Sequence, residues 1–246
     1  MSKIKRLRIF AGPNGSGKSS LFEKFSERYS TGTFINSDQI EKELNEKGYI
    51  DLSKYLIITN QEHLEQFLST KNALSLLNKS KLENKPINFY IVDNIIIDRP
   101  KNTHSYESAL ITSFIREKLM ESNQNFCFET VMSHQSKIEE VIEAKKRGYK
   151  IYFYFICLDD PEINISRVED RVNKGGHPVD PNKIVSRYPK TLENLLPILK
   201  IADKSFLIDN SEKMKIIAET SNGNLTVLED ENNLPNWFIE YIINKL

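Results

Sequence analysis

The sequence of 246 residues has little cysteine, with only Cys127 and Cys157. Both cysteines lie within apolar runs, and their spacing matches no ligand pattern of a zinc site. A disulfide framework and a cysteine-based metal centre are therefore not expected. We expect two buried thiols that behave as small hydrophobic side chains in a reduced, cytoplasmic protein.

The chain also lacks an excess of charge of either sign. Lysine and arginine number 34, aspartate and glutamate number 34, and the isoelectric point is about 6.9. A chain without net charge creates no overall field that would hold a polyanion. We therefore expect no nonspecific binding of nucleic acid, although a local basic patch remains open.

Long hydrophobic runs are absent as well. No apolar run approaches the roughly 20 residues that a membrane span needs. The N-terminus is basic, but the apolar run after it is too short for the core of a signal peptide. We expect no membrane association. The length suits a single α/β domain over residues 1–246.

Residues 12–19, GPNGSGKS, match the phosphate-binding pattern G-x-x-x-x-G-K-[ST] at every fixed position. An apolar strand is predicted before this segment at 7–11 and a helix after it at 20–29, which is the context that the pattern requires. Glycines let successive N–H groups turn toward an anion, and the helix N-terminus adds partial positive charge. A glycine-rich turn without a ligand is the alternative.

The pattern predicts ATP and Mg²⁺ as ligands. Lys18 is expected to reach the β- and γ-phosphates, and the Ser19 hydroxyl to bind Mg²⁺. The residues expected to surround the nucleotide are Gly12, Pro13, Asn14, Gly15, Ser16, Gly17, Lys18, Ser19 and Ser20.

Asp38 lies between a short strand predicted at 33–36 and a helix that ends near Gly48. A carboxylate there, beside the phosphate loop, is placed to take the proton from an attacking hydroxyl. Asp38 and Glu41 also spell a capping box for the same helix. The local pattern leaves both interpretations open.

The segment 49–101 is interpreted as an insertion. It contains a predicted helix at 62–77 and an apolar, β-branched stretch at 88–98 that Asp93 and Asn94 interrupt. The stretch that ends at Asp93 resembles a strand carrying a magnesium-binding aspartate. An ordinary hairpin is the favoured interpretation.

A strongly periodic helix is predicted at 105–121, with Arg116 as a solvated charge on its polar side. The strand after it, at 125–130, has Glu129 at its carboxyl end. Ligands of open α/β sheets bind beyond those ends, so Glu129 is a candidate for contact with substrate or with a magnesium-bound water. A hydrogen bond into the turn is the alternative. The next helix is predicted from Ser136, with Glu139 as its capping partner.

Residues 151–158 form an apolar run without alternation, as expected for the central strand of a sheet covered on both faces. Asp159 and Asp160 follow this run. Metal ligation is conceivable, but Pro161 occupies the first helical position, so helix capping is favoured.

Two helices, joined by Gly175, Gly176 and His177, carry cationic side chains on one face each. Arginine side chains can bind two phosphate oxygens and neutralise charge during phosphoryl transfer. The pair therefore resembles a lid, and a solvated hairpin is the alternative. The lid residues proposed from this pattern are Arg167, Arg171 and Arg187. The role of His177 stays open.

A last core strand at 205–208 ends at Asp209, Asn210 and Ser211. Asn210 is a candidate for contact with the nucleotide base, and a plain turn is equally compatible. The extension 212–246 is predicted to contain a hairpin around 221–224 and a packing helix opened by Pro235. It is interpreted as structural.

These motifs together resemble the zeta-toxin-like P-loop kinases, bacterial proteins related to a toxin that phosphorylates UDP-N-acetylglucosamine. The segments that carry the resemblance are GPNGSGKS at 12–19, INSD at 35–38, the helix at 105–119, FETVMSH at 128–134, NISRVEDRVNKGGHPV at 164–179, IVSRY at 184–188 and DNS at 209–211.

The resemblance implies a five-stranded parallel sheet of the nucleoside-kinase type, ATP with Mg²⁺, and Asp38 as the base for the acceptor hydroxyl. It also implies that Arg171, with Arg167 or Arg187, stabilises phosphate charge, and that an antitoxin is a candidate partner. The segments 49–101 and 212–246 have no evident counterpart in the compact toxins. Because 49–101 follows the Asp38 helix, it leaves the acceptor open more than the chemistry.

The sequence therefore predicts an ATP-dependent small-molecule kinase with a hydroxyl acceptor such as a nucleotide sugar. A regulatory ATPase of the ABC type would need an LSGGQ-like helix and an apolar strand ending in Asp-Glu, and neither is present. A polynucleotide kinase would need aromatic and basic clusters along a groove; the neutral charge and the lack of such clusters weigh against it, and a local groove in the segment 49–101 stays open.

Overall fold

The computed structural model of the chain describes residues 4–98 and 103–246. The chain divides into two compact units, each of which is described by itself. The first unit joins Met1–Thr31 to Cys127–Leu246, and the second is Gly32–Phe126. The segment singled out from the sequence as an insertion, as far as it is described, lies within the second unit.

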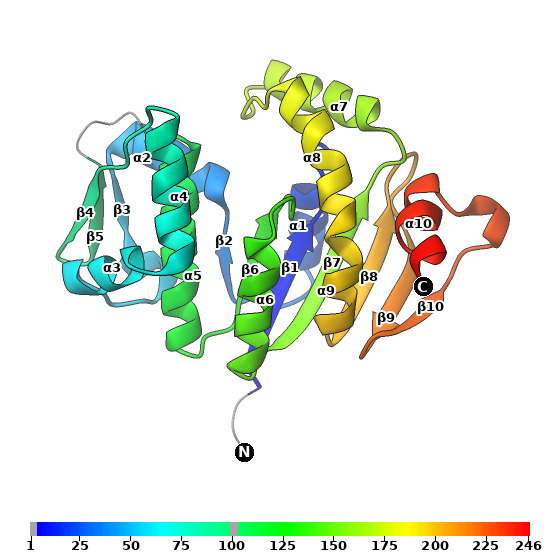
Figure 1. Ribbon diagram of the computed structural model, residues 1–246, viewed down its shortest axis with the longest axis horizontal. Coiled ribbons are helices and arrows are strands. Elements are labelled where there is room, and N and C mark those ends of the chain that lie inside the picture. Colours follow the sequence, from blue (N-terminus) through cyan, green and yellow to red (C-terminus); the bar gives the residue numbers. More distant parts are fainter. Residues whose placement is uncertain (1–3, 99–102) are drawn as a thin grey trace. The chain divides into compact units, whose positions relative to one another are not determined.

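The first unit is built on a sheet with strand order β10-β9-β8-β7-β1-β6 (Figure 1). Pairing is parallel between β1 and β7 and between β7 and β8. It is antiparallel from β8 to β9 and from β9 to β10. The strands are β1 (Arg6–Ala11), β6 (Phe126–Thr130), β7 (Lys150–Cys157), β8 (Lys204–Asp209), β9 (Lys215–Ser221) and β10 (Asn224–Val227).

The central position of β7 follows from its composition. Phe153, Phe155 and Ile156 are fully buried, as is Ile151 at the start of the run. A strand covered on both faces needs apolar side chains at successive positions rather than at alternate ones. The predicted central strand is thereby confirmed.

The hairpin β9–β10 turns at Asn222 and Gly223, whose φ angles are 49° and 83°. Two successive positive φ values match the right-handed twist of the strands, which is why Asn-Gly is favoured there. The predicted hairpin is confirmed. However, it pairs with β8 and extends the sheet, so the strand count differs from the predicted five parallel strands.

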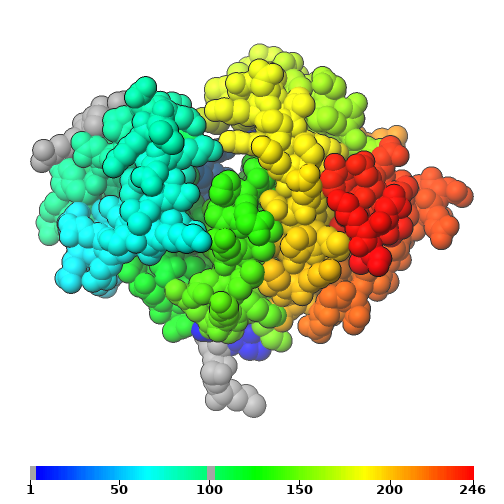
Figure 2. Space-filling model, viewed as in Figure 1, coloured from blue at the N-terminus to red at the C-terminus, as the bar shows by residue number. Residues whose placement is uncertain are grey.

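Helices cover the sheet of the first unit, with α6, α8 and α9 on the face shown in Figure 1. The helical segments are α1 (Lys18–Ser26), α6 (Ser136–Lys146), α7 (Pro161–Asn173), α8 (Pro181–Glu193), α9 (Leu195–Ile201), η2 (Glu231–Asn233), α10 (Asn236–Tyr241) and η3 (Ile243–Lys245). Figure 2 shows α10, in red, packed against the yellow α8.

Two helices of the first unit begin at capping aspartates. Asp160 accepts a hydrogen bond from Glu162 N at 2.8 Å, and Asp180 caps α8 in the same way. The capping box predicted at Ser136 is wrong, because Ser136 is already the first helical residue. Its N–H donates to the ring nitrogen Nδ1 of His134 at 3.3 Å.

The second unit combines helices with a small antiparallel sheet of order β3-β5-β4. Its elements are β2 (Thr33–Ile35), α2 (Ser37–Lys47), β3 (Tyr49–Asp51), η1 (Leu52–Tyr55), α3 (Gln61–Leu68), α4 (Lys71–Leu82), β4 (Phe89–Val92), β5 (Ile95–Asp98) and α5 (Ser105–Glu121). Asp93, with φ 49°, lies in the turn between β4 and β5. The ordinary hairpin is therefore the correct interpretation of Asp93.

Two predictions for this unit need correction. The single helix predicted at 62–77 is two helices, because Thr70 has extended backbone angles and its side chain accepts a hydrogen bond from Ala73 N as the cap of α4. Arg116 is not a solvated charge, since it is only 3% exposed. The helix α5 that carries it packs against both α2 and α4, which leaves it little polar surface.

Among the described residues, every helix falls short of the length and apolar character that a bilayer crossing requires.

Candidate functional site

The phosphate loop lies between β1 and α1. A side chain on any of three of its glycines would clash with a neighbouring group. A Cβ atom on Gly12 would lie 2.0 Å from Ile156 O, and one on Gly15 would lie 2.5 Å from Asn164 O. At Gly17, which has φ 102°, a Cβ would lie 2.6 Å from Asn210 Nδ2. Each position therefore excludes a side chain by steric contact as well as by backbone angle.

Lys18 folds over this loop. Its Nζ atom donates to Gly12 O at 2.9 Å and to Pro13 O at 2.7 Å. Within the described part of the chain, Ser16 Oγ and Asn14 Oδ1 are buried and have no hydrogen-bond partner. Buried polar atoms without partners are uncommon because their desolvation is not repaid. The loop thus carries buried polar atoms that a bound phosphate group would satisfy.

Ser19 and Glu129 are brought together at the start of α1 and the end of β6. Ser19 Oγ donates to Glu129 Oε2 at 3.0 Å. Across residues 4–98 and 103–246, no cluster of three or more His, Cys, Asp or Glu side chains is arranged to hold a metal ion. A hydroxyl and a carboxylate supply part of the oxygen set that Mg²⁺ prefers, and phosphate oxygens and water usually supply the rest.

Two asparagines support the loop from outside. Asn164, which is fully buried on α7, donates from Nδ2 to Asn14 O at 2.6 Å. Asn210, just after β8, donates from Nδ2 to Ser16 O at 2.9 Å. The amide of Asn210 thus lies on the loop backbone, and its predicted contact with the nucleotide base stays a prediction. Nothing in the sequence pattern indicated the contact that Asn164 makes.

The proposed lid arginines differ in the hydrogen bonds that they make. Arg167 donates to Asn210 O at 3.0 Å and to Ser211 O at 3.3 Å, so it holds the turn after β8. Arg171 donates to His177 O at 2.6 Å. Its Nε atom is buried and has no hydrogen-bond partner among the described residues.

Arg171 lines an open pocket of about 480 Å³. The other lining residues are Arg167, Asp170, Lys174, Gly175 and Gly176. The pocket lies at the C-terminal end of α7, where the two glycines end the helix. Arg187 is half-buried on α8. Its backbone carbonyl accepts a hydrogen bond from Thr191 Oγ1 at 2.8 Å.

The second unit contains Asp38 at the start of α2. The cap of this helix is Asn36, whose Oδ1 accepts from Asp38 N at 2.9 Å and from Gln39 N at 3.2 Å. Glu41, the expected capping partner, instead accepts from Ser108 Oγ at 3.2 Å. The interpretation of Asp38 as a capping residue is therefore wrong. Its side chain is exposed.

The carboxylates after β7 are structural. Asp160 caps α7, as predicted. Asp159 accepts from Trp237 N at 3.0 Å and from Asn236 Nδ2 at 2.6 Å, and it thereby caps α10. Asp160 therefore agrees with the predicted capping of the helix opened by Pro161, whereas the sequence did not indicate the contact of Asp159 with α10.

Both cysteines are buried and free, as predicted. Burial raises the pKa of the Cys127 thiol to about 12, and it also raises the pKa of Cys157. Thiols that stay protonated near neutral pH are poor nucleophiles. Neither cysteine is therefore a candidate for catalysis.

The sequence profile of the zeta toxin family matches residues 98–221, just over half of the chain. The chain belongs to the zeta toxin family. The matched segment contains Glu129, Arg167, Arg171 and Asn210, while the phosphate loop and Asp38 precede it. The resemblance inferred from the sequence motifs is thus confirmed.

One curated protein is similar to this chain over a short segment. A protein of unassigned function from Haemophilus influenzae (strain ATCC 51907 / DSM 11121 / KW20 / Rd) is 32% identical over 63 residues, which are 26% of this chain and 45% of that protein. The match thus spans less than half the length of that relative.

Two solved structures show a similar fold. The crystal structure of AvrRxo1-ORF1 with AvrRxo1-ORF2 and ATP superimposes with a TM-score of 0.53 at 14% identity, over 92% of this chain and 61% of the other. The PezAT chromosomal toxin-antitoxin system of Streptococcus pneumoniae gives a TM-score of 0.50 at 14% identity, over 100% and 81%. At this identity the likeness concerns the fold, which is the α/β fold of a P-loop kinase.

Proposed function

We propose that the chain is an ATP-dependent kinase that transfers the γ-phosphoryl group to a hydroxyl of a small-molecule acceptor. The observation that carries this proposal is the phosphate loop, in which three glycines fit against neighbouring groups and Lys18 covers the turn. Family membership and the P-loop kinase fold support the same activity.

Each candidate site residue of the first unit has a role in this proposal. The loop N–H groups and Lys18 bind the β- and γ-phosphates. Ser19 and Glu129 hold Mg²⁺, whose chemistry is to neutralise phosphate charge. Arg171 faces the open pocket and supplies positive charge to the transferring group, while Arg167 holds the turn after β8. Arg187 is proposed as a further lid cation.

Asp38 of the second unit is proposed as the base. The proton of the acceptor hydroxyl goes to the Asp38 carboxylate, the acceptor oxygen forms a bond to the γ-phosphorus, and the bond to the β-phosphate oxygen breaks to leave ADP. Asn36 already caps α2, so the exposed carboxylate of Asp38 is not needed as a helix cap, and this supports its role as the base. A nucleotide sugar such as UDP-N-acetylglucosamine is the proposed acceptor, by resemblance to the family.

The test is ATP turnover by the purified chain with a panel of hydroxyl acceptors headed by UDP-N-acetylglucosamine. We expect acceptor-dependent ADP formation and a phosphorylated product. Lys18→Ala should lower the rate by about a hundredfold or more, because phosphate positioning and charge neutralisation are lost together. Asp38→Asn should lower the rate by a similar factor while leaving ATP affinity and thermal stability unchanged.

Asn36→Ala is the matched control for Asp38→Asn. It should destabilise the second unit by about 1 kcal/mol, because the cap is lost, without removing the base. ATP hydrolysis at one rate whatever acceptor is added, together with an Asp38→Asn variant as active as the wild type, would contradict the kinase proposal and favour a regulatory ATPase.

The proposal includes an antitoxin partner, since the two structural neighbours are a toxin–antitoxin system and a complex with a second open reading frame product. Expression of the chain alone in bacteria should then slow growth, and Lys18→Ala should restore it. Normal growth with a demonstrably active kinase would argue against a toxin that needs neutralisation.

A further inference from the structure

The indole of Trp237, on α10, makes a hydrogen bond at the carboxyl edge of the sheet. Trp237 is 2% exposed, and its Nε1 atom donates to Asp209 Oδ1 at 3.3 Å. Its backbone N–H donates to Asp159 Oδ1 at 3.0 Å. The helix α10 is therefore joined to the ends of both β7 and β8. It lies outside the segment that the family profile matches.

The Asp209 carboxylate, which accepts this hydrogen bond, also stabilises the turn after β8. The residue is 6% exposed, and its carboxylate also accepts from Ser211 Oγ at 2.8 Å and from Ser211 N at 3.4 Å. A buried carboxylate needs several donors to offset its lost hydration. Trp237 supplies the donor that comes from outside the turn.

The turn after β8 also contacts the phosphate loop. Asn210, between Asp209 and Ser211, donates from Nδ2 to Ser16 O at 2.9 Å and packs against Gly17. A loop that binds anions through its N–H groups must direct its carbonyls elsewhere, and those carbonyls need donors. Asn210 satisfies one of them. Its own carbonyl accepts from Arg167 on α7.

We propose that Trp237 is a positioning residue for the nucleotide site. It acts through the carboxylate of Asp209, which shapes the turn that places the Asn210 amide against Ser16 O. The extension after residue 211, interpreted from the sequence as structural packing, would thereby set the affinity of the loop for ATP. This inference rests on the proposed function, because it takes the loop to be a nucleotide site.

The first variant is Trp237→Phe, which removes the indole N–H and keeps an aromatic ring against Phe155. We expect MgATP to bind about three- to tenfold more weakly by isothermal titration calorimetry, as for one lost hydrogen bond. Ile242→Ala is the matched control, because Ile242 is fully buried just after α10 and no hydrogen bond joins its side chain to the turn. It should lower the melting temperature and leave the affinity for MgATP unchanged.

The second variant tests the route. Asn210→Ala should also weaken MgATP binding, and adding Trp237→Phe to it should weaken binding no further, because the two changes act on one path. Trp237 is also the only tryptophan of the chain. MgATP should therefore change the intrinsic fluorescence of the wild type, and this change should be smaller in Asn210→Ala at saturating nucleotide.

The outcomes separate the two proposals. Wild-type affinity in Trp237→Phe, or fully independent effects of the two changes, would overturn the positioning role and leave the kinase proposal intact. A wild-type chain that binds no MgATP in the calorimeter contradicts the proposed function itself, and the positioning role falls with it.

Discussion

Gly12 and Gly223 both have positive φ angles, at 147° and 83°, yet their surroundings differ. A Cβ atom on Gly12 would meet Ile156 O at 2.0 Å and Ser16 Oγ at 2.9 Å. A Cβ atom on Gly223, in the hairpin turn, would meet nothing within 4 Å. The pair therefore separates the cost of backbone conformation from the cost of steric contact.

We expect Gly12→Ala to destabilise the chain by roughly 2–4 kcal/mol, because strain adds to a clash with a backbone carbonyl that cannot move aside. Gly223→Ala should cost about 1 kcal/mol from strain alone. Urea unfolding measures both. MgATP affinity should be lost only in Gly12→Ala, and equal losses of stability in the two variants would contradict this account of the loop.

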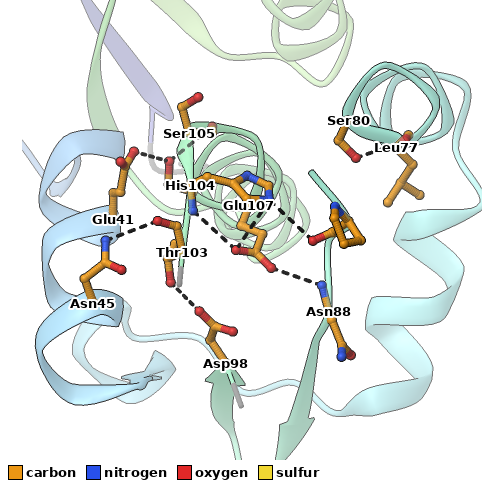
Figure 3. A network of polar contacts seen from close by, with 12 residues as sticks. Glu41, Asn45, Leu77, Ser80, Asn88, Asp98, Thr103, His104, Ser105 and Glu107 are labelled. Carbon is orange, nitrogen blue, oxygen red and sulfur yellow. Dashed lines mark hydrogen bonds and ion pairs between the residues drawn. The ribbon is translucent and has the colours of Figure 1, made fainter. Parts of the chain in front are cut away.

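The helix α5 begins at a buried polar network in the second unit (Figure 3). Glu107 is 2% exposed, and its carboxylate accepts from Asn88 N at 3.0 Å and from His104 N at 3.4 Å. Burial raises the pKa of Glu107 above its ordinary value, and the buried carboxyl of Asp98 adds to the rise, while the two N–H donors and His104 oppose it. The hydrogen bond from Thr103 fixes Asp98 nearby.

The elevated pKa gives a pH dependence of known sign. A carboxyl whose pKa is higher in the folded chain than in the unfolded chain stabilises fully below the unfolded value of about 4.5 and loses that contribution as pH rises through the folded value. Glu107→Gln removes this titration. The free energy of unfolding of wild type relative to Glu107→Gln should therefore fall as the pH rises above about 4.5, and a difference that stays constant with pH would contradict the assignment.

At the scale of the whole molecule, the proposed groups divide between the two units. The phosphate loop, Glu129 and the lid arginines belong to the first unit, whereas Asp38 and the segment 49–98 belong to the second. The roles proposed above therefore assign the nucleotide to the first unit and the acceptor to the second.

Hydrogen exchange tests this division. A non-hydrolysable ATP analogue should slow exchange at 12–19 and 209–211 in the first unit, because bound ligand opposes local opening. UDP-N-acetylglucosamine, added to that complex, should slow exchange further at 33–48 in the second unit. Acceptor protection confined to the first unit would contradict the assignment of Asp38 and its helix to acceptor recognition.

The sequence by itself determined the features whose cause is local. The phosphate loop, the buried strand β7, the Asn-Gly hairpin and the helix α5 were predictable, because residue spacing, turn chemistry and apolar periodicity act over neighbouring positions. Where several neighbouring residues could each cap a helix, the pattern was ambiguous. At α2 the cap is Asn36 and not Asp38.

Only the tertiary structure decided the contacts between residues far apart in the chain. Asn164 reaches Asn14 across 150 positions, and Asn210 reaches Ser16 across 194. The burial of Arg116 and the bond from Trp237 to Asp209 belong to the same class. The spacing of residues along the sequence does not predict such pairs. They form only when packing removes both groups from water, because a buried donor and a buried acceptor must then hydrogen-bond to each other.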